Sequence, residues 1–145
     1  MTQRVMSLEE AFAFAFKEEL RFGELYKKLY HIADDEDAKE LFRELSDMEV
    51  GHVERLKQLY STTFQGKTPV LEAVATPGNM IGGKKLTVRS GLEFAVVREE
   101  YAADHYFMMA DMALTDEVKS LLTALAEEEE KHAVLLEHKL DNLEL

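Results

Sequence analysis

The sequence predicts an all-α fold, a four-helix bundle of two antiparallel hairpins joined by a long crossover. Helix-forming residues dominate 7–60 and 88–142, and turn-forming residues gather between them. The second half of the chain also repeats the first at a fixed offset. A length of 145 residues suits one compact core. We therefore expect a single domain over residues 1–145, with the crossover at about 61–87.

The first hairpin begins with a helix start signal. Ser7 precedes Glu9 and Glu10, which is typical of an N-cap followed by an acidic first turn. The segment AFAFAF (11–16) alternates as a strand would, but its alanine content and the flanking pattern predict helix. The stretch DDED (34–37) interrupts the helical pattern and predicts the turn between the first two helices.

The second hairpin has a comparable turn at LTDE (114–117), with Thr115 or Asp116 as the expected cap. The stretch 61–91, which spans the connection between the hairpins, holds both prolines and five of the seven glycines. It predicts a long connection with one short helical turn near Val70–Ala75. About 27 residues can span ~85 Å when extended, which is enough to return along a bundle ~40 Å long. The segment PGNMIGGKK lacks the spacing of a phosphate-binding loop.

Composition excludes several functions. A formal charge of −12 argues against binding to nucleic acid or to anionic lipid. The chain contains no cysteine, which excludes disulfides, thiolate metal sites and thiol catalysis within it. The N-terminal stretch is a poor signal peptide, and no apolar run reaches membrane-spanning length. We therefore expect a cytoplasmic protein without a membrane partner.

An offset of 80 residues aligns the two halves of the chain without a gap. Identical residues then meet at eleven positions, four of which are polar or aromatic pairs of chemical interest. These pairs are Glu19 with Glu99, Tyr26 with Tyr106, Glu49 with Glu129, and His52 with His132. The two halves therefore look like two copies of one helical hairpin.

Each of the four repeated glutamates lies in the middle of an apolar helix face. Glu49, for example, shares its face with Leu45, Val53 and Leu56, at three- and four-residue spacings and multiples of them. An unpaired buried carboxylate costs several kcal/mol or becomes protonated. Four of them at one place require a positive partner.

Their positions along the helices indicate that they meet. Glu19 and Glu49 are both roughly fifteen residues from the first turn, which places each a little over 20 Å from it. Glu99 and Glu129 stand in the same relation to LTDE. His52 and His132 each follow a glutamate by three residues, on the same face. Four carboxylates and two imidazoles therefore converge if the hairpins pack face to face.

The predicted cluster suits two metal ions. Four carboxylates carry a charge of −4, which two divalent ions neutralise. Hard oxygen ligands with one nitrogen per ion suit iron or manganese better than zinc. In EEEE (127–130), the repeat and His132 select Glu129 as the inward residue. We expect Glu18, Glu100, His105 and His138 to face solvent.

The segments EELRFGELY, MEVGH, REEYAADHY and EEKH give the chain a resemblance to the rubrerythrin branch of the ferritin-like superfamily. This resemblance covers nearly the whole chain. It implies a di-iron carboxylate site, and it implies that a tyrosine follows a ligand seven residues later, as Tyr26 and Tyr106 do. These tyrosines are either plain core aromatics or hydrogen-bond donors to ligand carboxylates. The implied metal ligands are Glu19, Glu49, His52, Glu99, Glu129 and His132.

Two departures from that family pattern bear on activity. The chain lacks the four cysteines of a rubredoxin domain, and Ala102 or Ala103 stands where rubrerythrins have an extra glutamate. Both count against hydrogen-peroxide reduction by the rubrerythrin route.

Three functions stay open. The first is an oxidoreductase that reduces peroxide or oxygen, protects against oxidative stress and takes electrons from a separate donor protein. The second is an iron-sequestering protein, and the third is a helical interaction module that binds metal for stability. A homodimer is compatible with all three.

Overall fold

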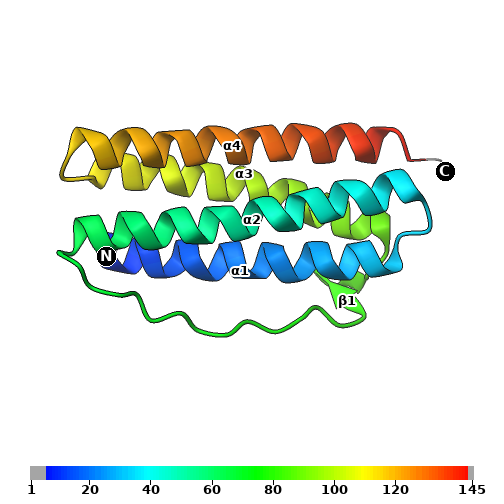
Figure 1. Cartoon of the computed structure of the whole chain (residues 1–145). Helices are drawn as coiled ribbons and strands as arrows, with labels where there is room; N and C mark the ends of the chain where they lie inside the picture. Colours follow the sequence, from blue (N-terminus) through cyan, green and yellow to red (C-terminus); the bar gives the residue numbers. More distant parts are fainter. Residues whose placement is uncertain (1–5, 144–145) are drawn as a thin grey trace, which may run out of the picture.

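Four long helices make up most of the computed structural model, which describes residues 6–143 (Figure 1). They are α1 (Leu8–Ile32), α2 (Glu36–Thr63), α3 (Val88–Met112) and α4 (Asp116–Asp141). α1 packs extensively on α2, and α3 on α4, while the contact between α2 and α4 is much smaller. The predicted four-helix bundle of two hairpins is confirmed, and the AFAFAF segment is helical within α1.

Side-chain caps set the helix starts. Ser7 Oγ accepts a hydrogen bond from the Glu10 amide at 3.1 Å, and Glu10 accepts one from the Ser7 amide at 3.2 Å. Thr115 caps α4 by accepting from the Val118 amide at 3.2 Å. Both predicted caps are confirmed. Asp35 caps α2, so the first turn is shorter than the predicted 34–37.

The core consists of two apolar clusters, one on each side of the bundle centre. One cluster includes Phe12, Leu56 and Leu122, and the other includes Phe42 and Leu92. Each fully buried side chain of this size contributes about 1.5–3 kcal/mol. On every helix, the stretch between the two clusters carries a buried glutamate. The bundle therefore has a polar layer at mid-height.

The crossover occupies residues 64–87, because α2 continues three residues beyond the expected end. It runs back along the outside of α1 (Figure 1), where Lys17 pairs with Glu72 at 3.4 Å and Thr76 donates to Glu24 at 3.2 Å. The predicted helical turn near Val70–Ala75 is wrong, since residues 67–78 contain no helix. The segment is instead held along α1 by the contacts of Glu72 and Thr76, and Pro77 disfavours helical geometry at Thr76, just after the predicted turn.

The end of the crossover is a short antiparallel hairpin of β1 (Met80–Ile81) and β2 (Lys84–Lys85). Its two turn residues, Gly82 and Gly83, have φ of 55° and 79°. A two-residue turn with positive φ at both positions favours glycine. The glycines of PGNMIGGKK therefore serve a tight turn. Between residues 6 and 143, no helix is both long and apolar enough to cross a membrane.

Two helical glycines should respond oppositely to substitution by alanine. A Cβ at Gly91 would overlap the buried Leu29 side chain, whereas a Cβ at Gly51 would meet nothing within 4 Å. We expect Gly91→Ala to lower the free energy of unfolding by about 1–3 kcal/mol through overpacking. Gly51→Ala should raise it by about 0.5–1 kcal/mol. Chemical denaturation measures both, and equal effects would contradict the close α1–α3 packing.

Candidate metal centre

The polar layer brings together one side chain or pair from each of the four helices. α1 and α3 each contribute one glutamate, and α2 and α4 each contribute a glutamate and the histidine one turn later. Each of these side chains is at most 4 % exposed. The structure therefore places all six residues singled out in the sequence at one site: Glu19, Glu49, His52, Glu99, Glu129 and His132.

The six residues form two overlapping groups of four. Glu19 and His52 belong to one group, Glu99 and His132 belong to the other, and both groups include Glu49 and Glu129. Within each group, the oxygen and nitrogen atoms that could bind a metal lie within 4.8 Å of one another. Two adjacent ions could therefore share the two central carboxylates.

Each imidazole faces a carboxylate of the other hairpin. His52 Nδ1 lies 2.7 Å from Glu129 Oε1, and His132 Nδ1 lies 3.1 Å from Glu49 Oε1. The two rings are parallel, with centroids 5.4 Å apart. Each histidine thus approaches the glutamate of the other helical hairpin, which gives the site an approximate two-fold symmetry.

The inward atoms of the cluster fit a bound cation. Ten buried side-chain oxygen and nitrogen atoms lack a hydrogen-bond partner among the described residues, and eight of them belong to the six cluster residues. Buried polar atoms are normally paired. Four carboxylates with two imidazole nitrogens form a hard donor set that is suited to divalent metal ions. The cluster is therefore compatible with metal binding, and its two groups match two ions.

Two buried tyrosines connect the hairpins at this layer. Tyr26 on α1 donates to Glu99 Oε1 on α3 at 2.6 Å, and Tyr106 on α3 donates to Glu19 Oε1 on α1 at 2.7 Å. Of the two open interpretations, the hydrogen-bonded one describes both tyrosines. Each bond holds one carboxylate oxygen and leaves Oε2 of the same glutamate without a partner. The tyrosines therefore orient the outer two glutamates.

Burial raises the pKa of Glu49 and of Glu129 well above the usual value, and the neighbouring carboxylates raise it further. Burial alone would also raise the pKa of Glu19, but the adjacent Glu49, His52 and Tyr106 side chains stabilise its charged form and hold that pKa below its usual value. Without metal, Glu49 and Glu129 therefore hold their protons to a higher pH than an ordinary glutamate does. Burial and nearby carboxylates also raise the pKa of both tyrosines, so they remain donors.

A pair of charged residues next to Nε2 of His52 was not predicted from the sequence. Glu128 Oε2 lies 3.5 Å from His52 Nε2 and 2.8 Å from Arg55 Nη1. A carboxylate on the outer nitrogen of a metal-binding histidine fixes the ring orientation. The internal repeat aligns Glu128 with Met48 and Arg55 with Leu135, but charges differ between the copies at many other positions too, so it does not single out this pair.

Two expectations about neighbouring residues are wrong. Glu18 is buried and pairs with Arg98 at 2.6 Å, because the outer faces of α1 and α3 lie against each other. His105 is also buried, and its Nε2 donates to the Ala11 carbonyl at 2.9 Å. Glu100 and His138 are exposed, as predicted.

The position of the extra rubrerythrin glutamate is filled by small apolar residues. Ala102 and Ala103 are both buried on α3. α3 therefore supplies one carboxylate to the cluster, that of Glu99.

Comparison with known proteins finds a matching family model. Residues 6–140 match the family model described as Rubrerythrin. No curated protein is similar enough to the chain to count as a relative.

Three solved structures share the fold. A hypothetical protein from Pyrococcus furiosus has 29% identity and a TM-score of 0.79, covering 93% of this chain and 89% of that one. A protein from Thermotoga maritima, described as a ferritin-like diiron-carboxylate protein, has 18% identity and a TM-score of 0.78, covering 97% of this chain and 99% of that one. A conserved hypothetical protein from Mycobacterium tuberculosis has 12% identity and a TM-score of 0.75, covering 93% of this chain and 91% of that one.

The stability of the metal-free protein should fall as pH rises. Glu49 and Glu129 have raised pKa values when folded, so above their ordinary pKa of 4.5 the folded protein binds more protons than the unfolded chain. The lowered pKa of Glu19 acts below 4.5 and leaves this window unchanged. Urea denaturation between about pH 5 and 8 measures the decline, and added ferrous or manganous ion should reverse it. A flat profile that metal does not change would contradict the site.

The number of metal ions bound per chain should distinguish residues that belong to both ligand groups from residues that belong to one. We expect about two ions per chain in the wild type, and about none in Glu129→Ala because that residue belongs to both groups. His52→Ala should weaken one ion more than the other. Glu130→Ala is the matched control, since the neighbouring side chain is exposed. Elemental analysis with competitive chelation measures both affinities, and full metal in Glu129→Ala would refute the assignment.

Proposed function

The chain belongs to the rubrerythrin family, and we propose that its buried cluster binds two iron ions and reduces peroxide or oxygen with electrons from a separate donor protein. One observation carries this proposal. Eight unpaired inward atoms form two overlapping ligand groups that share Glu49 and Glu129. Shared carboxylates would hold two ions close together, where both could exchange electrons with one oxygen or peroxide molecule.

Charge and donor type support iron as the metal. Four carboxylates balance two divalent ions, and oxygen donors with one imidazole per ion suit iron or manganese. The Thermotoga maritima protein of the same fold, described as a ferritin-like diiron-carboxylate protein, favours iron between the two. When bound, the ions supply the electron exchange with oxygen or peroxide, which the side chains of the site do not provide.

The side chains of the site would hold the two ions, orient the ligand carboxylates and exclude water. Glu49 and Glu129 would hold both ions, while His52 and His132 would each hold one. Tyr26 and Tyr106 donate hydrogen bonds that hold the outer glutamates. The apolar clusters on both sides of the layer exclude water, which strengthens every charge interaction in the site.

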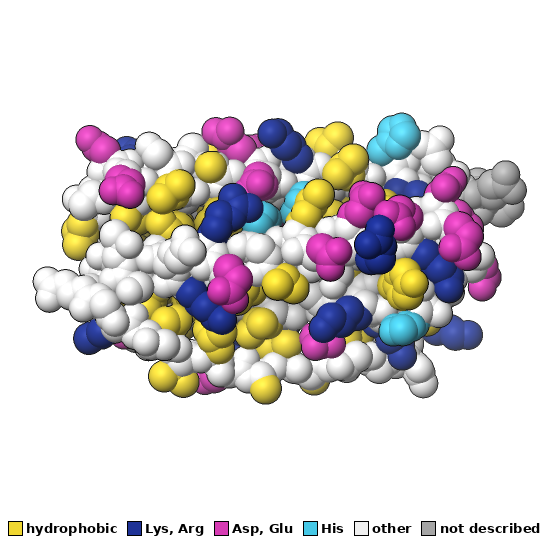
Figure 2. Space-filling view, in the orientation of Figure 1, with side chains coloured by type: hydrophobic (Ala, Val, Ile, Leu, Met, Phe, Trp, Pro, Cys, Tyr) yellow, Lys and Arg dark blue, Asp and Glu magenta, His cyan; other side chains and the backbone are white. Residues whose placement is uncertain are grey.

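The electrons come from another molecule. The sequence contains no cysteine, so its residues supply no thiolate ligands for an electron-transfer centre. The contact between α2 and α4 is the smallest between neighbouring helices, and His52 with Glu128 lies beneath it. Figure 2 shows histidine atoms in the seam between these helices. This sparsely packed seam is the entry route that we propose for a small oxidant.

The test is oxidation and turnover of the ferrous protein. Protein loaded anaerobically with two ferrous ions is mixed with either peroxide or oxygen, and ferric absorption is followed with and without a reductant. We expect rapid oxidation and repeated turnover in the wild type and in Glu130→Ala. Glu129→Ala, which removes a ligand shared by both groups, should lower the turnover rate by at least about a hundredfold.

Other results would select another function. Retention of far more than two iron ions per chain in large particles would support iron sequestration. Two tightly bound ions that neither oxidant changes would support a metal-stabilised interaction module. Either result would refute the proposed activity while leaving the metal site intact.

A further inference from the structure

A second feature lies outside the bundle, between α1, α3 and the crossover. It is a cavity of about 530 Å³. Phe22 and Leu25 of α1 form its floor, Phe94 of α3 forms one wall, and the crossover covers it through Val74 and Pro77. Cavities of roughly 300–1,000 Å³ with mainly apolar walls hold small organic ligands. The volume and lining of this cavity match that class of site.

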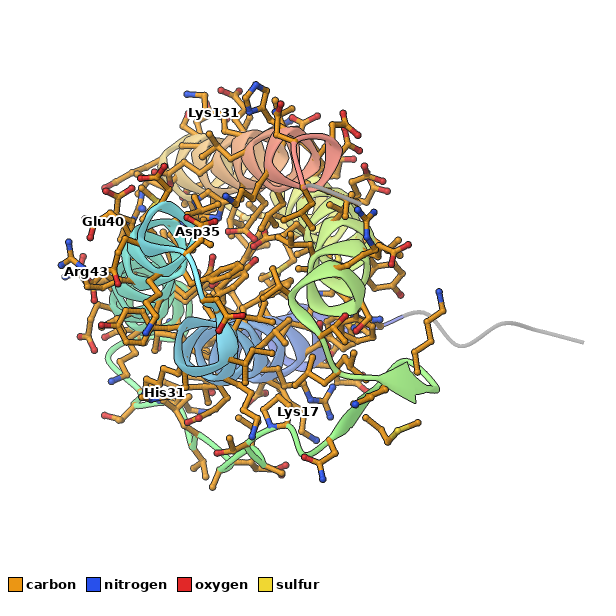
Figure 3. The ribbon with its side chains drawn as sticks, turned by 90° about the vertical axis from the view of Figure 1, so that its right-hand side faces the viewer. Lys17, His31, Asp35, Glu40, Arg43 and Lys131 are labelled. Carbon is orange, nitrogen blue, oxygen red and sulfur yellow. The ribbon has the colours of Figure 1, made fainter. Side chains whose placement is uncertain are left out.

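One end of the cavity is positively charged. Lys17, Arg21 and Arg98 line it together with a single acid, Glu18. Figure 3 shows Lys17 on the side of α1 that faces the crossover, where it pairs with Glu72 at 3.4 Å. Three cations thus face two carboxylates, which leaves one positive charge uncompensated. This excess stands out in a chain with a formal charge of −12.

The buried Glu18 organises this end. Its two oxygens receive one guanidinium each, from Arg98 Nη2 at 2.6 Å and from Arg21 Nη1 at 3.2 Å. A guanidinium has five N–H donors, so each arginine keeps donors for a further acceptor. The Arg98 guanidinium also lies over the Tyr101 ring at 5.2 Å. Two arginines held by one carboxylate form a pre-organised site for an anionic group.

We propose that this cavity binds an amphipathic organic anion, with its apolar body under the crossover and a carboxylate between Arg21 and Arg98. A single excess positive charge matches a singly charged carboxylate better than a doubly charged phosphate. The planar fork of arginine also matches carboxylate geometry. This site is separate from the metal cluster and does not depend on the proposed oxidoreductase activity.

The crossover acts as the cover of this site. Its contacts to α1 include two exposed ones, Lys17 with Glu72 and Thr76 with Glu24. Exposed polar contacts of this kind contribute little stability. The cover can therefore lift to admit a ligand and close over it without unfolding the bundle.

Calorimetric titration of the metal-loaded full chain with decanoate, below its micelle concentration, tests the proposal. We expect saturable binding of one decanoate per chain. Decyl phosphate should bind more weakly, and decan-1-ol and decylammonium should bind at least about tenfold more weakly, because neither offers an anionic acceptor to the arginines.

Two substitutions, each with a matched control, test where the ligand binds. Val74→Trp should fill the cavity and abolish binding, whereas Val70→Trp, on the same segment at a 92% exposed position, should not. Arg21→Gln should weaken binding about tenfold. Arg43→Gln removes an equally exposed arginine from an i,i+3 pair with Glu40 on α2 and should leave binding unchanged (Figure 3).

Circular dichroism and metal content should match the wild type in all four variants, since the substitutions lie outside the core and the metal cluster. Absence of saturable decanoate binding would overturn the proposal. Equal affinity for decan-1-ol would also overturn it, as would wild-type affinity in either Val74→Trp or Arg21→Gln. These results are independent of iron oxidation, so they separate this site from the proposed activity.

Discussion

The burial of four carboxylates in one layer of an apolar bundle is the constraint on which the rest of this structure depends. Glu19, Glu49, Glu99 and Glu129 are at most 1 % exposed, and apolar clusters lie on both sides of them. Such a layer is unfavourable unless protons or cations neutralise it. The protein thus gives up apolar burial at its centre, where a leucine would stabilise the fold, in return for a strong preference for cations.

The same layer joins the two hairpins. Tyr26 and Tyr106 bond to glutamates of the opposite hairpin, and each histidine approaches the opposite glutamate. Neither hairpin contains a complete ligand group, because both groups draw on Glu49 and Glu129. Metal binding would therefore be coupled to the docking of the hairpins, as expected where a site exists only in the folded state.

The internal repeat is not fully symmetric, and the surroundings of the two histidines are among its departures. Glu128 and Arg55 lie outside His52, while the matching positions in the other copy are Met48 and Leu135. The two imidazoles therefore have different outer surroundings. The outer surface of α1 and α3 has a further specialised region, where Glu18 holds Arg21 and Arg98 beneath the crossover.

The sequence by itself determined the helices, the caps and the six cluster residues. Helix periodicity is local, and the 80-residue repeat singled out Glu129 within EEEE. Only the tertiary structure decided the burial of Glu18 and His105, the extended path of residues 67–78, and the position of Glu128 against His52. Each of these depends on which distant element packs on an outer helix face. Periodicity shows which residues share a face, but it does not show what covers that face.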